Sequence, residues 1–404
     1  ITENGYDYLI VYAKEWLYKV DALSGTVVAS AKMDHKSDFA INSATYAEGM
    51  LFVGLANGCV QAFYADTLES AWIYRDKLGG QPNCPITYHD GYIYTGFWLS
   101  ETEYKNYVCL STTDEDPTKT DEEKLASWTY SSKGGFYWAG AYVTDGYMLV
   151  GTDDGNSGHA SNSAALLCLD PRTGAVLDRI DGLCGDIRCS IARYNDRFFF
   201  TSKGGYFYSV AMTTAADGTA RIDHESLKSV ALDNGDNTPG AEPMSTCTPV
   251  IYNNRAYIGV SGSSQFGAYS GHSITVIDLS SWSIAYTAPT QGYPQTSGLL
   301  TTAYGDEGVY VYFFDNYTPG KLRVLKDAPG QDAPDYLTTE QYNEKGTMIS
   351  VDTPYVLFTP QDAQAQYAIC SPIADSYGTI YFKNDSAYLM ALTNSVTNAE
   401  VITQ

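Results

Sequence analysis

Basic residues are scarce in this chain of 404 residues, which has 24 Lys and Arg against 47 Asp and Glu and a formal net charge of −23. A nucleic-acid backbone is held by clustered Lys and Arg side chains, and the sequence has no such cluster. We therefore expect no nucleic acid among its partners. An acidic surface suits a solvated secreted protein, or one that attracts cations.

Long apolar runs are also lacking. No stretch approaches the roughly 18 residues of a membrane-spanning helix, and the start has no signal-peptide pattern. The chain begins at Ile1 without Met, so we expect a processed or excised segment that has lost an upstream export signal. The expected location is extracellular, periplasmic or at the cell surface, without a membrane span.

Amphipathic helical patterns are hard to find, and the acidic segment from Glu122 to Ala126 is the only plausible short helix. The 35 Tyr residues instead favour strands. One pattern recurs along the chain: a short alternating run, a two-residue turn, and a second run rich in Tyr, Val, Ile and Phe. Examples are CPITYHDGYIYTGFW and CTPVIYNNRAYIGVSGS. Seven segments follow this pattern, and an eighth, shortened copy has its turn at Asn4-Gly5.

The turns use Asp-Gly, Asn-Asp, Asn-Asn or Glu-Gly, which tolerate the positive φ of a tight hairpin. A third run ends in Asp and leads through a turn, with Gly25 or Gly174 as the left-handed residue, to a fourth strand. The pattern recurs about every 50 residues, the period of a propeller blade. We predict an all-β fold, an eight-bladed β-propeller of four-stranded antiparallel blades, with seven blades as the alternative. It would form one domain over residues 1–404, with insertions at 112–127 and 327–348.

The segments CPITYHDGYIYTGFW and ALLCLDPRTGAVLDR together resemble the quinoprotein-dehydrogenase-like (PQQ-like) repeat. This family includes pyrroloquinoline-quinone enzymes and many non-enzymatic relatives. The resemblance covers nearly the whole chain and implies a propeller, here a non-enzymatic bacterial surface member. The outer-strand Trp of the repeat is kept at Trp72 but is replaced by Val or Leu in several other blades.

Catalytic motifs are absent from the sequence. An enzyme of this family is expected to have an adjacent Cys-Cys pair, a channel Trp, a Ca²⁺ site and an Asp base, and no Cys-Cys pair occurs here. The five His residues lack metal-ligand spacing, and no nucleophile elbow stands out. We expect no catalysis and no cofactor, apart from the Ca²⁺ considered below.

Four connections between second and third strands are lengthened: Trp98–Asn106, Asp153–Ser163, Ser261–His272 and Asp315–Gly320. In a propeller, the 2–3 and 4–1 connections leave one face, here called the loop-rich face, and the 1–2 and 3–4 turns leave the other, the turn face. Loops carry function more often than the framework does. With the 4–1 loop SSKGGFYWAG, they supply the candidate ligand-binding residues Trp98, Tyr104, Phe136, Tyr137, Trp138, Phe266, Tyr269, Asp315 and Tyr317. Such aromatics suit stacking on sugar rings or gripping a peptide; alternatively, each covers its own loop.

The segment Asp153–Gly158, DDGNSG, resembles the opening of a calcium loop but lacks its terminal Glu. Asp153, Asp154 and Asn156 are the candidate Ca²⁺ ligands, and a polar, Gly-rich turn is the alternative.

Four cysteines occupy one repeat position at the start of the innermost strand and are expected around the channel mouth: Cys84, Cys189, Cys247 and Cys370. They could form a soft-metal or redox site, or serve as small buried hydrophobes. Cys184 and Cys189 could also close a small disulfide.

Our leading hypothesis is a non-catalytic, monomeric, extracellular or cell-surface propeller that binds a glycan, peptide or partner protein through its loop-rich face. One alternative is a scaffold in envelope protein assembly, resembling the propeller lipoprotein of outer-membrane assembly. A second is a divergent quinone- or metal-dependent oxidoreductase that uses the channel-mouth cysteines.

Overall fold

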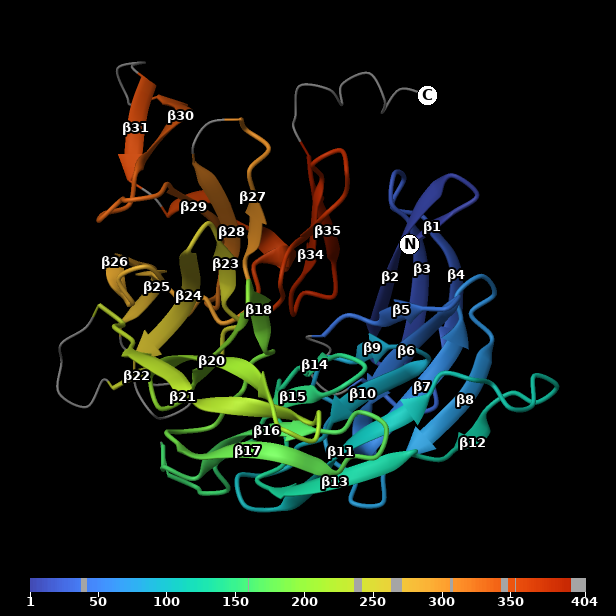
Figure 1. The fold of residues 1–404 in the computed structure, drawn as a ribbon. Helices are drawn as coiled ribbons and strands as arrows, with labels where there is room; N and C mark the ends of the chain where they lie inside the picture. Colours follow the sequence, from blue (N-terminus) through green and yellow to red (C-terminus); the bar gives the residue numbers. More distant parts are fainter. Residues whose placement is uncertain are drawn as a thin grey trace. The chain divides into compact units, whose positions relative to one another are not determined.

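The fold is an all-β, eight-bladed β-propeller of four-stranded antiparallel blades, as predicted. Figure 1 labels the strands of the individual blades. The computed structural model describes residues 1–37, 42–158, 160–235, 242–262, 271–305, 308–342, 348–352 and 354–393. The chain divides into two compact units, Ile1–Ser229 and Val230–Gln404, and each is described by itself.

The first unit contains blades one to five. Blade one has strands β1 (Thr2–Glu3), β2 (Tyr6–Ala13), β3 (Trp16–Asp21) and β4 (Val27–Lys32). Blade two has β5 (Thr45–Ala47), β6 (Met50–Leu55), β7 (Cys59–Tyr64) and β8 (Ser70–Arg75), with a 3₁₀ turn at Ala56–Gly58. Blade three has β9 (Thr87–His89), β10 (Tyr92–Gly96), β11 (Tyr104–Ser111) and β13 (Trp128–Lys133). Blade four has β14 (Tyr142–Val143), β15 (Met148–Gly151), β16 (Ala164–Leu169) and β17 (Val176–Leu183). Blade five has β18 (Ala192–Tyr194), β19 (Arg197–Ser202), β20 (Tyr206–Thr214) and β21 (Ala220–Ala231).

The second unit contains blades six to eight. Blade six has β22 (Pro243–Met244), β23 (Val250–Tyr252), β24 (Arg255–Gly262), β25 (His272–Asp278) and β26 (Ser283–Pro289). Blade seven has β27 (Leu299–Thr301), β28 (Val309–Asp315), β29 (Lys321–Asp327) and β32 (Tyr355–Phe358). Between β29 and β32 the chain forms a separate hairpin of β30 (Tyr336–Tyr342) and β31 (Met348–Asp352). Blade eight shows β33 (Ile373–Ala374), β34 (Ile380–Lys383) and β35 (Leu389–Leu392) within the described residues, after a 3₁₀ turn at Asp362–Gln364.

The turn residues fold the blades as the sequence indicates. Asn4 and Gly5 have φ values of 52° and 82°, and Asp90 and Gly91 have 45° and 77°, so both pairs form the left-handed turns that match strand twist. At the end of β16, Asp170 accepts backbone N–H groups of the following turn. These local contacts help to fix the register of the hairpins that contain them.

One local expectation was wrong. The segment expected as a short helix contains β12 (Glu122–Lys124), which pairs in parallel with β8 of blade two. The insertion between β11 and β13 thus adds a fifth strand to the neighbouring sheet. Pairing with an exposed sheet edge satisfies the backbone of both strands, whereas a helix this short leaves most of its backbone N–H and C=O groups without intrahelical partners.

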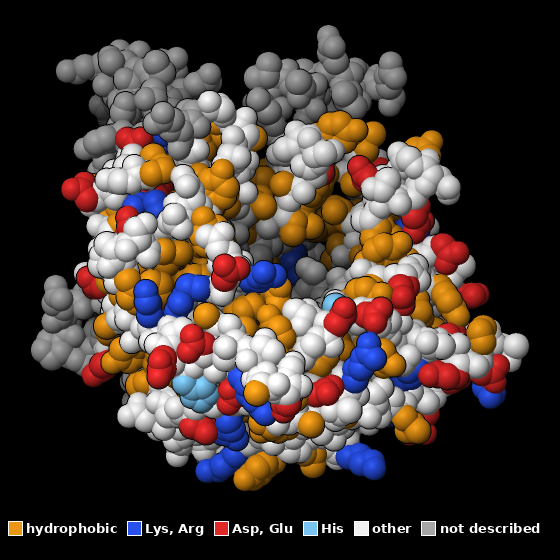
Figure 2. All heavy atoms as spheres, in the orientation of Figure 1, with side chains coloured by type: hydrophobic (Ala, Val, Ile, Leu, Met, Phe, Trp, Pro, Cys, Tyr) orange, Lys and Arg blue, Asp and Glu red, His pale blue; other side chains and the backbone are white. Residues whose placement is uncertain are grey.

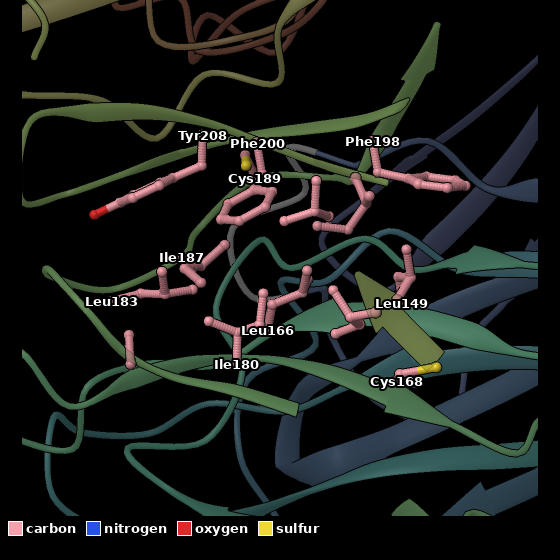
Figure 3. Close-up of a cluster of buried hydrophobic side chains, with 14 residues drawn as sticks. Leu149, Leu166, Cys168, Ile180, Leu183, Ile187, Cys189, Phe198, Phe200 and Tyr208 are labelled. Atoms are coloured by element: carbon pink, nitrogen blue, oxygen red, sulfur yellow. The ribbon is translucent and has the colours of Figure 1, made fainter. Parts of the chain in front are cut away.

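Hydrophobic clusters lie between consecutive blades. One cluster joins β15, β16 and β17 of blade four to β19 and β20 of blade five, with Leu166 and Phe200 fully buried in it (Figure 3). A second such cluster joins blades six and seven, and a third joins blades seven and eight. Alternating side chains from the two faces of each blade build these layers, which leaves the connecting loops at the blade ends to carry the site.

Charges of both signs are interspersed over the side of the protein that Figure 2 shows. Acidic residues outnumber basic ones in the whole sequence. Within the described residues, no helix combines the length and apolar composition needed to cross a membrane.

Candidate functional site

Three aromatic rings form a stack in the first unit. The Tyr137 ring lies 4.5 Å from that of Trp98, at 22° between planes, and 4.1 Å from that of Trp138, at 18°. Trp98 follows β10 in a 2–3 loop, and the other two rings belong to the 4–1 connection between blades three and four. Each of the three side chains is partly exposed. Three of the predicted aromatic residues, which come from two different loops, therefore lie in one cluster.

Backbone geometry holds the second of these loops in place. Gly134 and Gly135 have φ values of 81° and 68°, and a Cβ added to Gly135 would lie 2.7 Å from the Phe97 carbonyl oxygen. Trp138 has a φ of 56°, a left-handed conformation that is uncommon for a bulky residue. Such strain persists only where surrounding contacts impose it and is frequent at functional sites.

A buried arginine lies beneath this stack. The Arg188 guanidinium carbon is 4.9 Å from the Tyr137 ring centroid and 5.6 Å from that of Trp98. Its Nη2 atom donates to Glu101 at 2.5 Å and to Asp153 at 2.6 Å, and lies 3.0 Å from Asp186. Cation–π contacts of this kind orient both the cation and the rings.

The charged groups around Arg188 come from three consecutive blades. Glu101 lies in the 2–3 loop of blade three, Asp153 in that of blade four, and Lys203 between β19 and β20 of blade five. Lys203 Nζ is 3.1 Å from Asp186 and 3.8 Å from Glu101. The loop-rich ends of blades three, four and five therefore meet in one ionic network.

Burial and charge act in opposite directions on the carboxyl groups of this network. Burial raises the pKa of Asp153 well above its usual value, although Arg188 counteracts it. Burial has the same tendency at Asp186, but the nearby Arg188 and Lys203 outweigh it and lower that pKa. The carboxylate oxygens of Glu101, Asp153 and Asp186 lie within 4.8 Å of one another. Arg188 contacts all three, so a cation of the protein already lies between them.

The three candidate calcium ligands already form hydrogen bonds with other groups of the protein. Asp153 accepts from Arg188 through both carboxylate oxygens. Asp154 accepts the backbone N–H groups of Asn156 and Ser161 and the Ser161 hydroxyl. The Asn156 amide donates to the Asp154 carbonyl oxygen. A Ca²⁺ ion would have to displace these donors, so the proposal of calcium binding stays a prediction without further support.

The other predicted loop residues are spread over the chain. Phe136 is fully buried and packs edge-on against Tyr107 at 5.0 Å between centroids. Tyr104 is exposed at the start of β11. In the second unit Asp315 is fully buried and accepts from Arg323, whereas Tyr317 is exposed. Phe266 and Tyr269 lie outside the described residues.

The four predicted channel-mouth thiols are buried: Cys84, Cys189, Cys247 and Cys370. Cys189 packs among the hydrophobic side chains of the cluster in Figure 3, and burial raises its pKa to about 11. Cys84 donates to the Phe136 carbonyl oxygen at 3.3 Å. Cys184 and Cys189 are both free thiols, so the considered disulfide is not formed.

A pocket of about 260 Å³ lies at the turn face of blades three and four. It is lined by His89, Tyr92, Asp145 and Arg172, among others, and His89 Nε2 lies 2.8 Å from Asp145 Oδ1. This pocket lies at the end of the blades away from the aromatic stack, and sequence reasoning did not anticipate it.

Two residues central to the network, Asp186 and Arg188, were also missed. They occur in the segment Gly185–Cys189, of which only Cys189 is a candidate site residue in the sequence analysis. A usable signal was present, because Asp186 and Arg188 place two charges in a 4–1 loop just before an inner strand.

No model of a known protein family matches the sequence, and no curated protein matches it. Among solved structures, the chain is similar to BamB from Moraxella catarrhalis, with 10% identity and a TM-score of 0.55 over 95% of this chain and 93% of that one. It is also similar to Sqt1 from Saccharomyces cerevisiae, with 9% identity and a TM-score of 0.57 over 96% and 98% of the two chains. At such identities the likeness shows the propeller fold alone, and the PQQ-like family resemblance stays a prediction.

Proposed function

We propose that this protein is a non-catalytic binding propeller that recognises an extracellular glycan, peptide or partner protein at the loop-rich face of blades three to five. The observation that carries the proposal is the Trp98–Tyr137–Trp138 stack over Arg188. Partly exposed aromatic side chains beside a buried arginine are the residue types that anchor binding surfaces.

The arrangement of the site favours binding over chemistry. Arg188 is tied to Glu101, Asp153 and Asp186, and its role is to fix the rings above it. These ion pairs link three separate loops, one of which carries Trp98, so the backbone around the rings is held in place before a ligand arrives. Preorganisation of this kind lowers the entropic cost of binding.

The two alternative functions gain less support. Similarity to BamB concerns the fold and assigns no partner to this chain, so a scaffold role in envelope assembly rests on the sequence resemblance. An oxidoreductase that uses the channel-mouth thiols would need accessible thiolates. Cys84 and Cys189 are instead buried, and burial raises the pKa of both thiols.

The proposal is tested by screening the immobilised chain against a glycan array and a peptide library, and then measuring each hit by calorimetry. We expect saturable binding that weakens at least tenfold in Trp98→Ala and Tyr137→Ala. Tyr92→Ala is the matched control, because it removes a 38% exposed aromatic side chain at the turn-face pocket. Binding lost in Tyr92→Ala but kept in Trp98→Ala would move the site to the turn face and overturn the proposal.

A further inference from the structure

Two indole N–H groups of the aromatic stack have no acceptor among the described residues. The Nε1 atoms of Trp98 and Trp138 are both buried and unpaired. An indole nitrogen is a donor only, and a buried donor left unpaired costs about 1–3 kcal/mol. Both side chains are partly exposed, so a small turn of either ring on binding presents its N–H to a ligand. The stack is therefore completed best by a ligand that brings acceptor oxygens.

The charge of the site argues against an anionic ligand. Glu101, Asp153 and Asp186 face Arg188 and Lys203, so both cations of this network are already paired and leave no surplus positive charge for an anionic ligand. Glu101 is the most exposed of the three carboxylates, with 30% of its side chain accessible. The whole chain has a net charge of −23, so long-range repulsion acts in the same direction.

The shape of the site argues against a cationic ligand. The rings are nearly parallel, with interplanar angles of 22° and 18°, and so do not form the crossed walls that enclose a quaternary ammonium group. A cation also brings no acceptor for the indole donors. Parallel rings instead present flat, electron-rich faces, which attract the weakly positive C–H groups of a flat ligand.

We propose, on the basis of the proposed function, that the ligand is a neutral carbohydrate. A pyranose ring stacks its C–H face on an indole ring, and its hydroxyl groups accept from the Trp98 and Trp138 N–H groups. The same hydroxyl groups can donate to Glu101. Unlike an anionic or a cationic ligand, a neutral sugar combines a C–H face, acceptor oxygens and no charge.

The test uses the full chain on an array that carries neutral oligosaccharides, uronic-acid and sulfated oligosaccharides, and peptides, with calorimetry on each hit. We expect binding to neutral oligosaccharides only. Trp98→Ala should weaken it at least tenfold, and Trp138→Phe, which keeps a ring but removes the N–H, should weaken it about fivefold. Trp16→Ala is the matched control, because Trp16 is 41% exposed in blade one and belongs to none of the ring stacks in the described part of the chain; its affinity should stay within twofold. Near-ultraviolet circular dichroism checks that each variant is folded.

The other outcomes separate the two proposals. Binding of acidic glycans or of peptides, weakened by Trp98→Ala, would overturn the carbohydrate inference and leave the proposed function standing. Neutral-sugar binding that is unchanged in Trp98→Ala and Trp138→Phe would overturn the assignment of this site. Absence of binding to all the oligosaccharides and peptides would overturn the carbohydrate inference and, of the proposed function, the recognition of a glycan or a peptide.

Discussion

A single carboxylate anchors a buried polar network in the second unit. Asp327 is fully buried and accepts from Arg255 at 2.6 and 2.9 Å, and from the hydroxyls of Tyr257 at 2.7 Å and Tyr286 at 2.8 Å. We expect Asp327→Ala to lower the free energy of unfolding by about 3–5 kcal/mol, because it leaves the Arg255 charge buried without its partner. Urea denaturation followed by circular dichroism measures the effect. Asp332→Ala, at an exposed position, should change stability by less than about 0.5 kcal/mol, and equal losses in both variants would contradict this account.

The thiol of Cys189 gives a prediction about pH. Burial raises its pKa to about 11, whereas an unfolded thiol ionises near about 8.5. Its contribution to stability is therefore complete below about pH 8.5 and is lost as the pH rises towards 11. We expect the stability advantage of the wild type over Cys189→Ala to shrink as the pH rises from about 8 to about 10.5, as measured by urea denaturation. A constant difference in stability between the two proteins across this range would show that burial does not raise the pKa of the Cys189 thiol.

At the residue scale, the sequence indicates which aromatic side chains lie in loops, where they are candidates for ligand binding. It does not indicate which side chains of other blades they contact. Tyr137 and Trp98 were correctly expected in loops, because aromatic residues interrupt the blade pattern there. The contact of Asp153 with Arg188 depends on where two loops from different blades meet. No spacing in the sequence determines that distance, so the sequence alone could not pair Asp153 with Arg188.

Strand β12 is an element whose role can be tested by one substitution. Its Lys124 is buried, lies with Nζ 5.2 Å from the centroid of the Trp72 ring of β8, and pairs with Glu115 at 2.6 Å. We expect Lys124→Ala to expose the Trp72 ring, lower stability by about 1–3 kcal/mol and shift tryptophan emission to longer wavelength. Lys119→Ala removes an exposed lysine that pairs with Asp116 at 2.5 Å in the same insertion, and it should leave the free energy of unfolding nearly unchanged, because water screens an exposed pair. An unchanged emission spectrum in Lys124→Ala would mean that β12 does not cover Trp72.

At the element scale, the hairpins were predictable because each turn carries its own signal. The Asn4-Gly5 and Asp90-Gly91 turns have the positive φ values that their residue types allow. Strand β12 was not predictable, because its partner β8 belongs to another blade and a three-residue segment has too few positions to show strand alternation. Pairing between blades is a tertiary contact, and tertiary contacts override weak local preferences.

At the scale of the whole molecule, the charge of −23 predicts how stability responds to salt. Like charges over the surface repel one another in the compact state, and added salt screens exposed charges beyond about 10 Å at about 0.1 M ionic strength. Buried pairs such as Arg255–Asp327 are screened much less. We therefore expect the thermal midpoint to rise as NaCl increases from about 20 mM to about 500 mM, measured by differential scanning calorimetry at pH 7.

The matched measurement repeats the titration at a pH near the sequence pI of about 4.4. Protonation of carboxyl groups removes most of the net charge there, so the stabilisation by salt should largely disappear. A midpoint that falls with salt at pH 7 would show that attractive ion pairs outweigh the net repulsion. In that case the stability of the chain would rest on networks such as the one around Arg188, and weakening that network would reduce stability as well as binding.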